Sequence, residues 1–555
     1  MVSLRTLLLT LALLVTAECT FNWTSCDPAQ FDSSTVPVPF ECGTLDVPFD
    51  YTSHNSSEKL TLKLIKAPAP LGSKGTILFN MGGPGVSNRN DFSTLAPILI
   101  PLTGGQYDLV TFAFDTRGTV DTIPFRCHKD PVEQFRAFFS QEPSNSSDTS
   151  LGKLWTRGAA DAEACSTYAA KDGAVLTTAF VARDLMRVVD ALDEDGLLRY
   201  YGFSYGITLG ATAAAMFPDR IDKMILDAVQ NVHEYYHAQA NFEEWELSDQ
   251  LFSAIFHHCV EAGPELCPLA SYNQTAEELE AAAWDLLEAT KYQPAPVGKL
   301  VVDYPALKTL YAQGLYSPRS WPSLTAVVDH LAFGGENAAI PLDTILAGLP
   351  SINTTAVTLP SLIIGDMALA GIYCGDNQVR TKSFADFLPA VEKLYKTSSV
   401  MGDVAMGSYA RCQQWKIKPK ETYTRSFDVR TKNPILFVGN TLDGHTPLKS
   451  AYNVSSGFEG SVVLEVDGFG HGSSSVPSEC SLKTISAYWA DGTLPESGTR
   501  CDRSVEPYTG EWWPKVFTDA GVNASWIAER MPVGLGNEPA TQFQKGITCD
   551  SHSAY

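Results

Sequence analysis

The sequence is poor in positive charge and contains no run of lysine or arginine residues. Its 555 residues carry 40 Lys and Arg against 63 Asp and Glu, a formal net charge of −23. Nucleic acids and anionic membrane surfaces would repel such a chain, so neither is expected as a partner. Internal repeats and long low-complexity tracts are also missing. With 44% apolar residues, the composition is that of a globular protein with a large core.

Long apolar runs are missing beyond the first residues. The chain begins with the positively charged Arg5, an apolar stretch from Leu7 to Val15 and small residues up to Ala17. This pattern predicts a secretory signal peptide over residues 1–17, and the apolar stretch is too short to favour the alternative of a signal anchor. We therefore expect a secreted protein without a membrane segment once the signal is removed.

The cysteines include no Cys-x-x-Cys pair and no His/Cys cluster of the kind that binds zinc, so no metal is expected. Ten of the 12 cysteines lie in close sequential pairs, and local pairing predicts the disulfides Cys26–Cys42, Cys127–Cys165, Cys259–Cys267, Cys374–Cys412 and Cys480–Cys501. Cys19 remains with Cys549; it either leaves with the signal peptide or pairs with Cys549.

Asn-x-Ser/Thr sequons, the acceptor sites for N-linked glycans, occur throughout the chain. Seven sequons begin at Asn22, Asn55, Asn145, Asn273, Asn353, Asn453 and Asn523. Together with the paired cysteines they predict a glycoprotein that folds in an oxidising, extracellular or secretory compartment.

Short apolar strands alternate with helical segments on both sides of a long helical section. Strands are expected near 75–80, 107–114, 198–203, 223–229, 433–443 and within 461–472. Helices are expected near 153–195 and 207–217, after Pro447, and near 479–490. This alternation predicts an α/β fold with a mostly parallel, doubly wound sheet. We place the first part of the core at 18–230, a mainly helical cap insertion at 231–430, and the second part with a C-terminal tail at 431–555.

The segment Leu198-Arg-Tyr-Tyr-Gly-Phe-Ser-Tyr-Gly206 contains a Gly-x-Ser-x-Gly pattern, which alone is a weak signal. Its setting is more specific, because an apolar strand ends at Phe203 and a helical run begins just after Ser204. A sharp strand–turn–helix junction crowds the positions two residues before and after the serine, where glycine fits best. The pattern predicts Ser204 as a nucleophile whose Oγ is open to a base.

A serine hydroxyl needs a base at neutral pH, and two histidines follow predicted strands. His471 stands in a glycine-flanked loop, and His445 stands in Asp443-Gly-His-Thr-Pro447. The chain order Ser, Asp, His of α/β-hydrolases favours His471 as the base and Asp443 as its orienting acid. His445 is the rival base, and a capping or turn role is the alternative for Asp443.

Backbone donors for an oxyanion are expected at two places. The loop Asn80-Met-Gly-Gly-Pro-Gly85 follows a predicted strand, and its glycines allow a close approach of the Gly83 N–H to a tetrahedral oxygen. The second donor is the N–H of Tyr205. The loop lacks the phosphate-binding pattern GxxxxGK[ST], and a simple tight turn is its alternative interpretation. No organic cofactor is implied.

Several of these motifs, taken in order, resemble a known family. The first set is GGPG, Asp115-Thr-Arg-Gly118, GFSYG, NTLDGHTP and GFGHG. The second set lies in the C-terminal third of the chain and is Ile372-Tyr-Cys-Gly-Asp376, Cys412-Gln-Gln-Trp415, Pro477-Ser-Glu-Cys480 and Gly492-Thr-Leu-Pro495. Over residues 40–505 the chain is similar to secreted tripeptidyl aminopeptidase-like α/β-hydrolases, which are relatives of proline iminopeptidases. The resemblance implies an α/β-hydrolase fold and the triad Ser204, Asp443 and His471.

The resemblance implies a serine exopeptidase that releases short peptides from substrate N-termini through an acyl-enzyme. An anionic anchor for the substrate amino group would follow. Glu243, Glu244 and Asp376 are the candidates, although a solvated helix or loop charge is the favoured interpretation of each. An esterase or lactonase acting on a small secreted metabolite is the main alternative. A non-catalytic binding protein on the same scaffold is the third. The expected partner is thus a peptide or a small acyl substrate; the oligomeric state is not predicted.

Overall fold

The computed structural model describes residues 21–27, 31, 38–53, 56–85, 88–112, 116–119, 122–335 and 359–522. Within these residues a ten-stranded sheet has the order β1-β2-β3-β5-β4-β6-β7-β10-β11-β12. Its strands are β1 (Thr24–Ser25), β2 (Glu41–Pro48), β3 (Lys59–Ala67), β4 (Thr76–Asn80), β5 (Asp108–Phe112), β6 (Leu198–Phe203), β7 (Ile221–Asp227), β10 (Leu436–Leu442), β11 (Val462–Phe469) and β12 (Arg500–Asp502). The predicted signal peptide lies outside the described residues.

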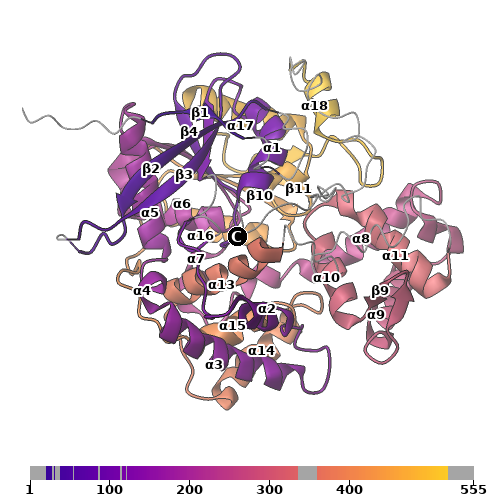
Figure 1. Cartoon of the computed structure of the whole chain (residues 1–555). Helices are drawn as coiled ribbons and strands as arrows, with labels where there is room; N and C mark the ends of the chain where they lie inside the picture. Colours follow the sequence, from indigo (N-terminus) through magenta and orange to yellow (C-terminus); the bar gives the residue numbers. More distant parts are fainter. Residues whose placement is uncertain are drawn as a thin grey trace, which may run out of the picture.

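The sheet is parallel from β5 to β12, and the first strands add to it in antiparallel fashion. Buried side chains alternate between its two faces, as the period of a strand requires. In β6, Tyr200 enters the core beneath α5 (Thr178–Leu192) and α6 (Tyr205–Met216), whereas Tyr201 enters the opposite core. The mostly parallel, doubly wound sheet with covered faces confirms the predicted fold class (Figure 1).

The opposite face is covered by helices from both ends of the chain. These are α1 (Asn88–Leu102), α17 (Glu479–Asp491) and α18 (Trp513–Asp519). Their fully buried Leu99, Trp489 and Trp513 belong to one apolar cluster. The short helix α16 (Leu448–Ser455) packs against β10 and β11. The first and last parts of the sequence therefore build one core.

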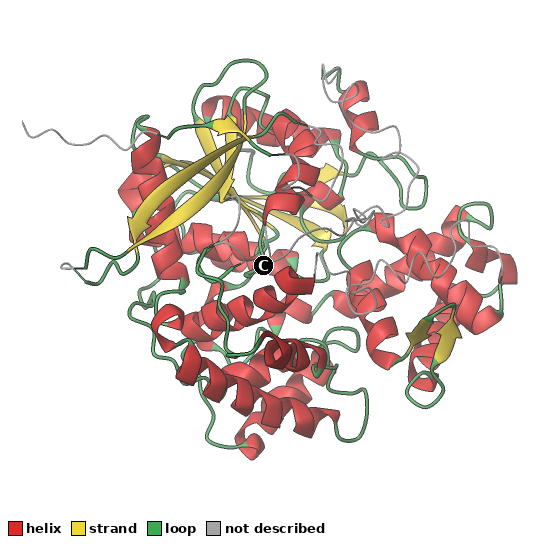
Figure 2. Ribbon diagram, in the orientation of Figure 1, coloured by secondary structure: helices red, strands yellow, loops and turns green. Residues whose placement is uncertain are grey.

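Between β7 and β10 the described chain is helical except for one hairpin, β8 (Ala295–Val297) with β9 (Leu300–Val302), seen as the isolated yellow pair in Figure 2. The longer helices are α7 (Val232–His237), α8 (Ser248–Ala262), α9 (Ala276–Ala289), α10 (Tyr304–Gly314), α11 (Trp321–Phe333), α13 (Leu359–Asp376), α14 (Phe384–Thr397) and α15 (Met406–Cys412). Figure 1 shows them in two groups, with α8 to α11 in one and α13 to α15 in the other. The boundaries at 230 and 430 stay a prediction.

The predicted single helical section near 153–195 is divided in the structure. It contains α3 (Ser150–Tyr168), the short α4 (Ala170–Gly173) and α5, and it is preceded by α2 (Pro131–Phe139). Helix α3 leaves the sheet and packs against α15 of the insertion. A side chain at Gly158 would lie 2.9 Å from the Cα of Arg411, so the absence of one permits this close approach.

All five predicted disulfides are present, which confirms the local pairing. Cys374–Cys412 joins α13 to α15, and Cys480–Cys501 joins α17 to β12. Cys19 and Cys549 lie outside the described residues.

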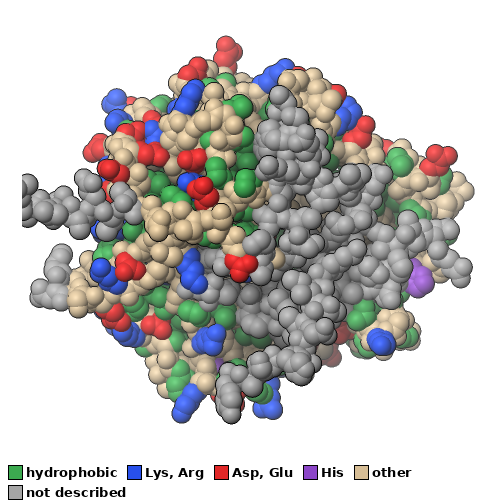
Figure 3. Space-filling model, turned by 45° about the horizontal axis from the view of Figure 1, so that its top comes forward, with side chains coloured by type: hydrophobic (Ala, Val, Ile, Leu, Met, Phe, Trp, Pro, Cys, Tyr) green, Lys and Arg blue, Asp and Glu red, His purple; other side chains and the backbone are tan. Residues whose placement is uncertain are grey.

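Charged side chains of both signs are interspersed on the face drawn in Figure 3, and no patch of one sign stands out there. In the part of the chain that is described, none of the helices combines the length and the apolar character that a membrane span requires.

Candidate active site

Ser204 lies in the sharp turn between β6 and α6. Its backbone has φ +53° and ψ −124°, an unusual conformation for a residue with a side chain. A Cβ at Gly202 would lie 2.4 Å from the carbonyl oxygen of Gly206, and one at Gly206 would lie 2.4 Å from that of Asn80. Both glycines are therefore required by the turn, which is the geometry of a nucleophile elbow.

His471 and Asp443 form a close pair at the same edge of the sheet. Asp443 directly follows β10, and His471 stands two residues after β11. The Nδ1 atom of His471 lies 3.1 Å from both carboxylate oxygens of Asp443. Because Nδ1 is occupied in this way, Nε2 is the ring nitrogen left to exchange a proton with a substrate or nucleophile.

The pair also shifts both pKa values. Burial opposes the charge of Asp443, but the attraction of His471 and several hydrogen bonds outweigh it, so the pKa of this carboxyl is lowered. Burial alone would lower the pKa of His471, but Asp443 reverses that effect and raises it, with smaller contributions from Glu244 and Asp227. The acid is thus held as a carboxylate that stabilises an imidazolium.

Thr446 belongs to the same cluster and was missed by the sequence analysis. Its hydroxyl donates to Asp443 Oδ2 at 2.7 Å and lies 3.2 Å from His471 Nδ1. Its backbone N–H and that of His445 donate to Asp443 Oδ1. A hydroxyl three residues after an aspartate in a tight turn is a signal that could have identified it.

His445, the rival base, is placed differently. It is buried, and its ring lies against Tyr316, with centroids 4.0 Å apart, and against Trp245 at 5.7 Å. Burial, followed by the repulsion of His471, lowers the pKa of His445 to about 3. The imidazole is therefore neutral and packed among rings. Of the two histidines, only His471 has its ring nitrogen against Asp443 in the described contacts.

The loop that carries His471 lies beside the elbow that carries Ser204, and Asp227 at the end of β7 joins them. The N–H of Ser204 donates to the carbonyl oxygen of Asp227 at 3.2 Å. The carboxylate of Asp227 accepts the N–H of Ser473 at 2.9 Å, two residues beyond His471, and the hydroxyl of Tyr201 at 3.1 Å. The turn of Ser204 and the loop of His471 are thus connected through Asp227 at one sheet edge.

The predicted oxyanion loop reaches Ser204 through its first glycine. A Cβ at Gly82, where φ is +107°, would lie 2.9 Å from the Cβ of Ser204. The N–H of Gly82 is bound to the side chain of Asn80 at 3.0 Å, so the donor of Gly83 is the next along the loop. Tyr205 is the first residue of α6, where a backbone N–H has no intrahelical acceptor.

Comparison with known proteins places this geometry in a family. A model of the alpha/beta hydrolase fold matches residues 64–316, and a model described as TAP-like protein matches residues 398–501. The chain has the α/β-hydrolase fold. Its TAP-like C-terminal region confirms the resemblance to the tripeptidyl aminopeptidase-like family.

Relatives of this α/β-hydrolase cover most of its length at low identity. It is 25% identical to the serine protease Hip1 of Mycobacterium tuberculosis over 473 residues, which are 79% of this chain and 83% of the relative. It is 23% identical to a tripeptidyl aminopeptidase of Streptomyces lividans over 510 residues, 88% of this chain and 87% of the relative. A putative hydrolase of Escherichia coli, YuaR, is 23% identical over 422 residues, 74% of this chain and 76% of the relative.

The three acidic candidates differ in their surroundings within the hydrolase. The carboxylate of Asp376 accepts the N–H and the hydroxyl of Thr178 and the hydroxyl of Tyr235. Burial raises its pKa to about 7. Glu243 lies 3.5 Å from the ammonium group of Lys449. Asp376 and Glu243 therefore have protein partners that explain them as structural charges.

Glu244 is different because it lies close enough to His471 for opposite charges on the two groups to attract each other. Its carboxylate accepts the side-chain amides of Asn241 at 2.7 Å and Gln230 at 3.3 Å. Burial raises its pKa to about 7, while the attraction of His471 lowers it. The hydroxyl of Tyr373 donates in turn to Asn241 Oδ1. A partly buried carboxylate on the His471 side of the molecule is suited to a cationic group of a substrate.

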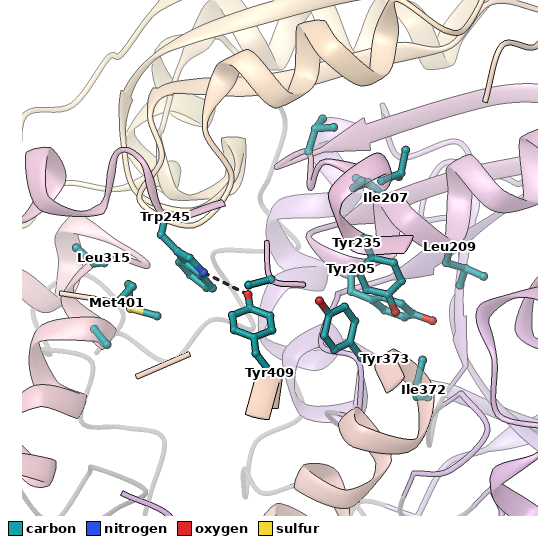
Figure 4. Packing of buried hydrophobic residues seen from close by; sticks show 14 of the residues in the cluster. Tyr205, Ile207, Leu209, Tyr235, Trp245, Leu315, Ile372, Tyr373, Met401 and Tyr409 are labelled. Atoms are coloured by element: carbon teal, nitrogen blue, oxygen red, sulfur yellow. Dashed lines mark hydrogen bonds between the residues drawn. The ribbon is translucent and has the colours of Figure 1, made fainter. Parts of the chain in front are cut away.

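Aromatic residues of α6 and of the insertion pack together. Figure 4 shows Tyr205, Tyr235 and Tyr373 close together, and Trp245 pointing toward Tyr409, whose hydroxyl accepts its indole N–H at 3.3 Å. Tyr205 begins α6, and the other four rings belong to the insertion. Tyr235 lies in α7, Trp245 lies just before α8, Tyr373 lies in α13 and Tyr409 lies in α15. In the described part of the hydrolase, no group of three or more His, Cys, Asp and Glu side chains is arranged to hold a metal ion.

Proposed function

We propose that this hydrolase is a secreted serine exopeptidase that releases short peptides from the N-termini of its substrates. The observation that carries the exopeptidase assignment is Glu244, an enclosed carboxylate of the insertion whose charge acts on His471. A serine protease and tripeptidyl aminopeptidases among the relatives support a peptidase over other hydrolases.

The proposed reaction follows from the geometry of the pair and the elbow. Ser204 Oγ attacks the scissile carbonyl carbon while its proton passes to His471 Nε2, because Nδ1 is occupied by Asp443. The N–H groups of Gly83 and Tyr205 stabilise the oxyanion. His471 then donates the proton to the leaving amine as the C–N bond breaks. Water, deprotonated by the same nitrogen, releases the acyl group and restores the serine hydroxyl.

Glu244 supplies what recognition of a free N-terminus needs. An α-amino group has a pKa near 8 and is mostly cationic at neutral pH, so an enclosed anion would hold it by a charge-assisted hydrogen bond. Asn241 and Gln230 fix the orientation of the carboxylate. An arriving cation also lowers the pKa of Glu244 from about 7, so the ion pair forms as the substrate binds.

The test is a peptide library in which each sequence has a free or an acetylated N-terminus. We expect cleavage of the free peptides, and Glu244→Gln should lower kcat/KM for them about 10- to 100-fold, the range of a charged hydrogen bond. Glu243→Gln is the matched control and should change kcat/KM less than twofold, because its carboxylate is paired with Lys449. Equal cleavage of acetylated peptides, or activity on esters alone, would contradict the proposal.

The proposed compartment rests on separate observations. Five disulfides are expected in an oxidising environment. Described sequon asparagines are exposed at Asn22, Asn145, Asn273 and Asn453. Enzymatic removal of N-glycans from the secreted protein should lower its apparent mass, and an unchanged mass would remove the glycoprotein prediction.

A further inference from the structure

Tyr316 of the insertion lies directly against the catalytic pair. It follows α10 by two residues, and its carbonyl oxygen accepts the backbone N–H of His471 at 2.9 Å. Its ring meets the His471 ring edge to face, with centroids 5.5 Å apart, and covers the ring of His445 at 4.0 Å. The insertion therefore contacts the core at His471, the proposed general base of the triad.

One side of the Tyr316 ring remains free. The residue is 52% exposed, whereas the neighbouring Leu315 is fully buried. Because the ring meets that of His471, its exposed surface lies beside the imidazole.

The position of His471 decides which part of a substrate this ring would meet. Nε2 must reach the nitrogen of the leaving group to protonate it, so groups packed beside the imidazole lie along the leaving side of the scissile bond. Glu244, in contrast, is proposed to hold the amino end of the acyl part. The two insertion residues would therefore contact opposite sides of the cleaved bond.

We propose that Tyr316 is a specificity-determining residue whose ring forms the wall for the first residue of the leaving peptide, favouring an apolar or aromatic side chain there. This rests on the proposed function. A flat apolar side chain gains contact with the free ring face, whereas glycine gains none. The backbone carbonyl that holds His471 is kept in any substitution of the side chain.

The test uses one free-amino tripeptide acyl part joined to different leaving amides. Tyr316→Ala should lower kcat/KM about tenfold for a phenylalaninamide leaving group and less than twofold for glycinamide, because only the former contacts the ring. Tyr316→Phe should behave like the wild type. Tyr292→Ala, at a position that is 82% exposed, is the control for loss of a surface tyrosine. An equal loss for both leaving groups, or no loss, would overturn the proposal.

A second measurement keeps the proposal testable if Tyr316→Ala fails to fold. The wild-type acyl-enzyme can be captured by an added amine, which forms a new amide bond and restores the Ser204 hydroxyl. Phenylalaninamide should compete with water about tenfold better than glycinamide, and equal capture would overturn the proposal. If the enzyme cleaves only esters, the peptidase assignment fails, but benzyl and methyl esters of one acid still test the wall through their leaving alcohols.

Discussion

Asp227 provides a quantitative test of how the nucleophile and the histidine loop are held together. It is fully buried, and its carboxylate accepts the N–H and the hydroxyl of Ser473 and the hydroxyl of Tyr201. Asp227→Ala leaves three buried donors without this acceptor. At 1–3 kcal/mol for each unsatisfied group, the unfolding free energy at pH 4, where the Asp227 carboxyl is protonated in the folded state, should fall by about 3 kcal/mol or more.

Asp227→Asn should be far milder. The Ser473 N–H needs an acceptor, so the amide oxygen takes the place of Oδ1 and the NH2 group takes that of Oδ2. At that position the hydroxyls of Ser473 and Tyr201 can rotate so that their oxygens accept hydrogen bonds from the NH2 group. The substitution also removes an ionisable carboxyl group. Burial raises the pKa of this carboxyl to about 6, with a contribution from Asp443.

The difference between wild type and Asp227→Asn should depend on pH. An unfolded aspartate has a pKa near 3.9, so the folded state holds its proton more tightly, and wild-type stability is lost as pH rises from about 4 to 6. The gap of about two pH units corresponds to about 3 kcal/mol. Asp227→Asn should therefore gain up to that amount relative to wild type over this interval, and stay constant above it.

The assay is urea unfolding of each variant at pH 4, 5, 6 and 7, with kcat/KM measured in parallel. Asp227→Ala should also lower kcat/KM about 100-fold, because a small shift of the histidine loop misplaces the base. The reasoning is refuted if Asp227→Ala costs less than 1 kcal/mol at pH 4, or if Asp227→Asn is as damaging as Asp227→Ala at pH 7.

Three further predictions concern the site. Ser204→Ala should abolish labelling by a fluorophosphonate probe with an unchanged melting temperature, and remaining label would place the nucleophile elsewhere. His471→Ala should lower kcat about 10⁴-fold and His445→Ala less than tenfold, with the reverse order assigning the base to His445. Gly82→Ala should lower kcat at least 100-fold, since its Cβ would lie 2.9 Å from that of Ser204 and its φ is +107°; wild-type kinetics would show that the loop yields.

Sequence analysis could predict those parts of the site that depend on short sequence motifs and on the strands beside them. Ser204 sits in a turn whose glycines are fixed by contacts within a few residues or with the adjoining strand, so a short pattern describes it. His471 and Asp443 follow strands whose apolar runs are recognisable, and chain order gave their proposed roles. The same reasoning identified the disulfides, because each joins two cysteines that are consecutive along the chain.

The residues that it missed act over long distances in the sequence. In the sequence, Asp227 is an ordinary residue at the end of a strand. Its partner Ser473 lies 246 residues further along the chain. Tyr316 is one tyrosine in a helical insertion, and only the tertiary fold brings its carbonyl oxygen to His471. Arg117, in a motif used for the family resemblance, proves to be a buried structural group that pairs with Asp184 at 2.6 Å. None of these contacts leaves a periodic or spaced pattern.

The packing of α3 against α15 has a consequence for how the protein is made. The side chain of Gln414 donates to the carbonyl oxygen of Trp155, which precedes it by 259 residues. The buried Arg411 likewise lies 3.3 Å from Asp161 of α3. At a synthesis rate of roughly 5–20 residues per second, α3 must wait about 10 to 50 seconds for its partner. During that interval the face of α3 that packs against α15 is exposed to solvent.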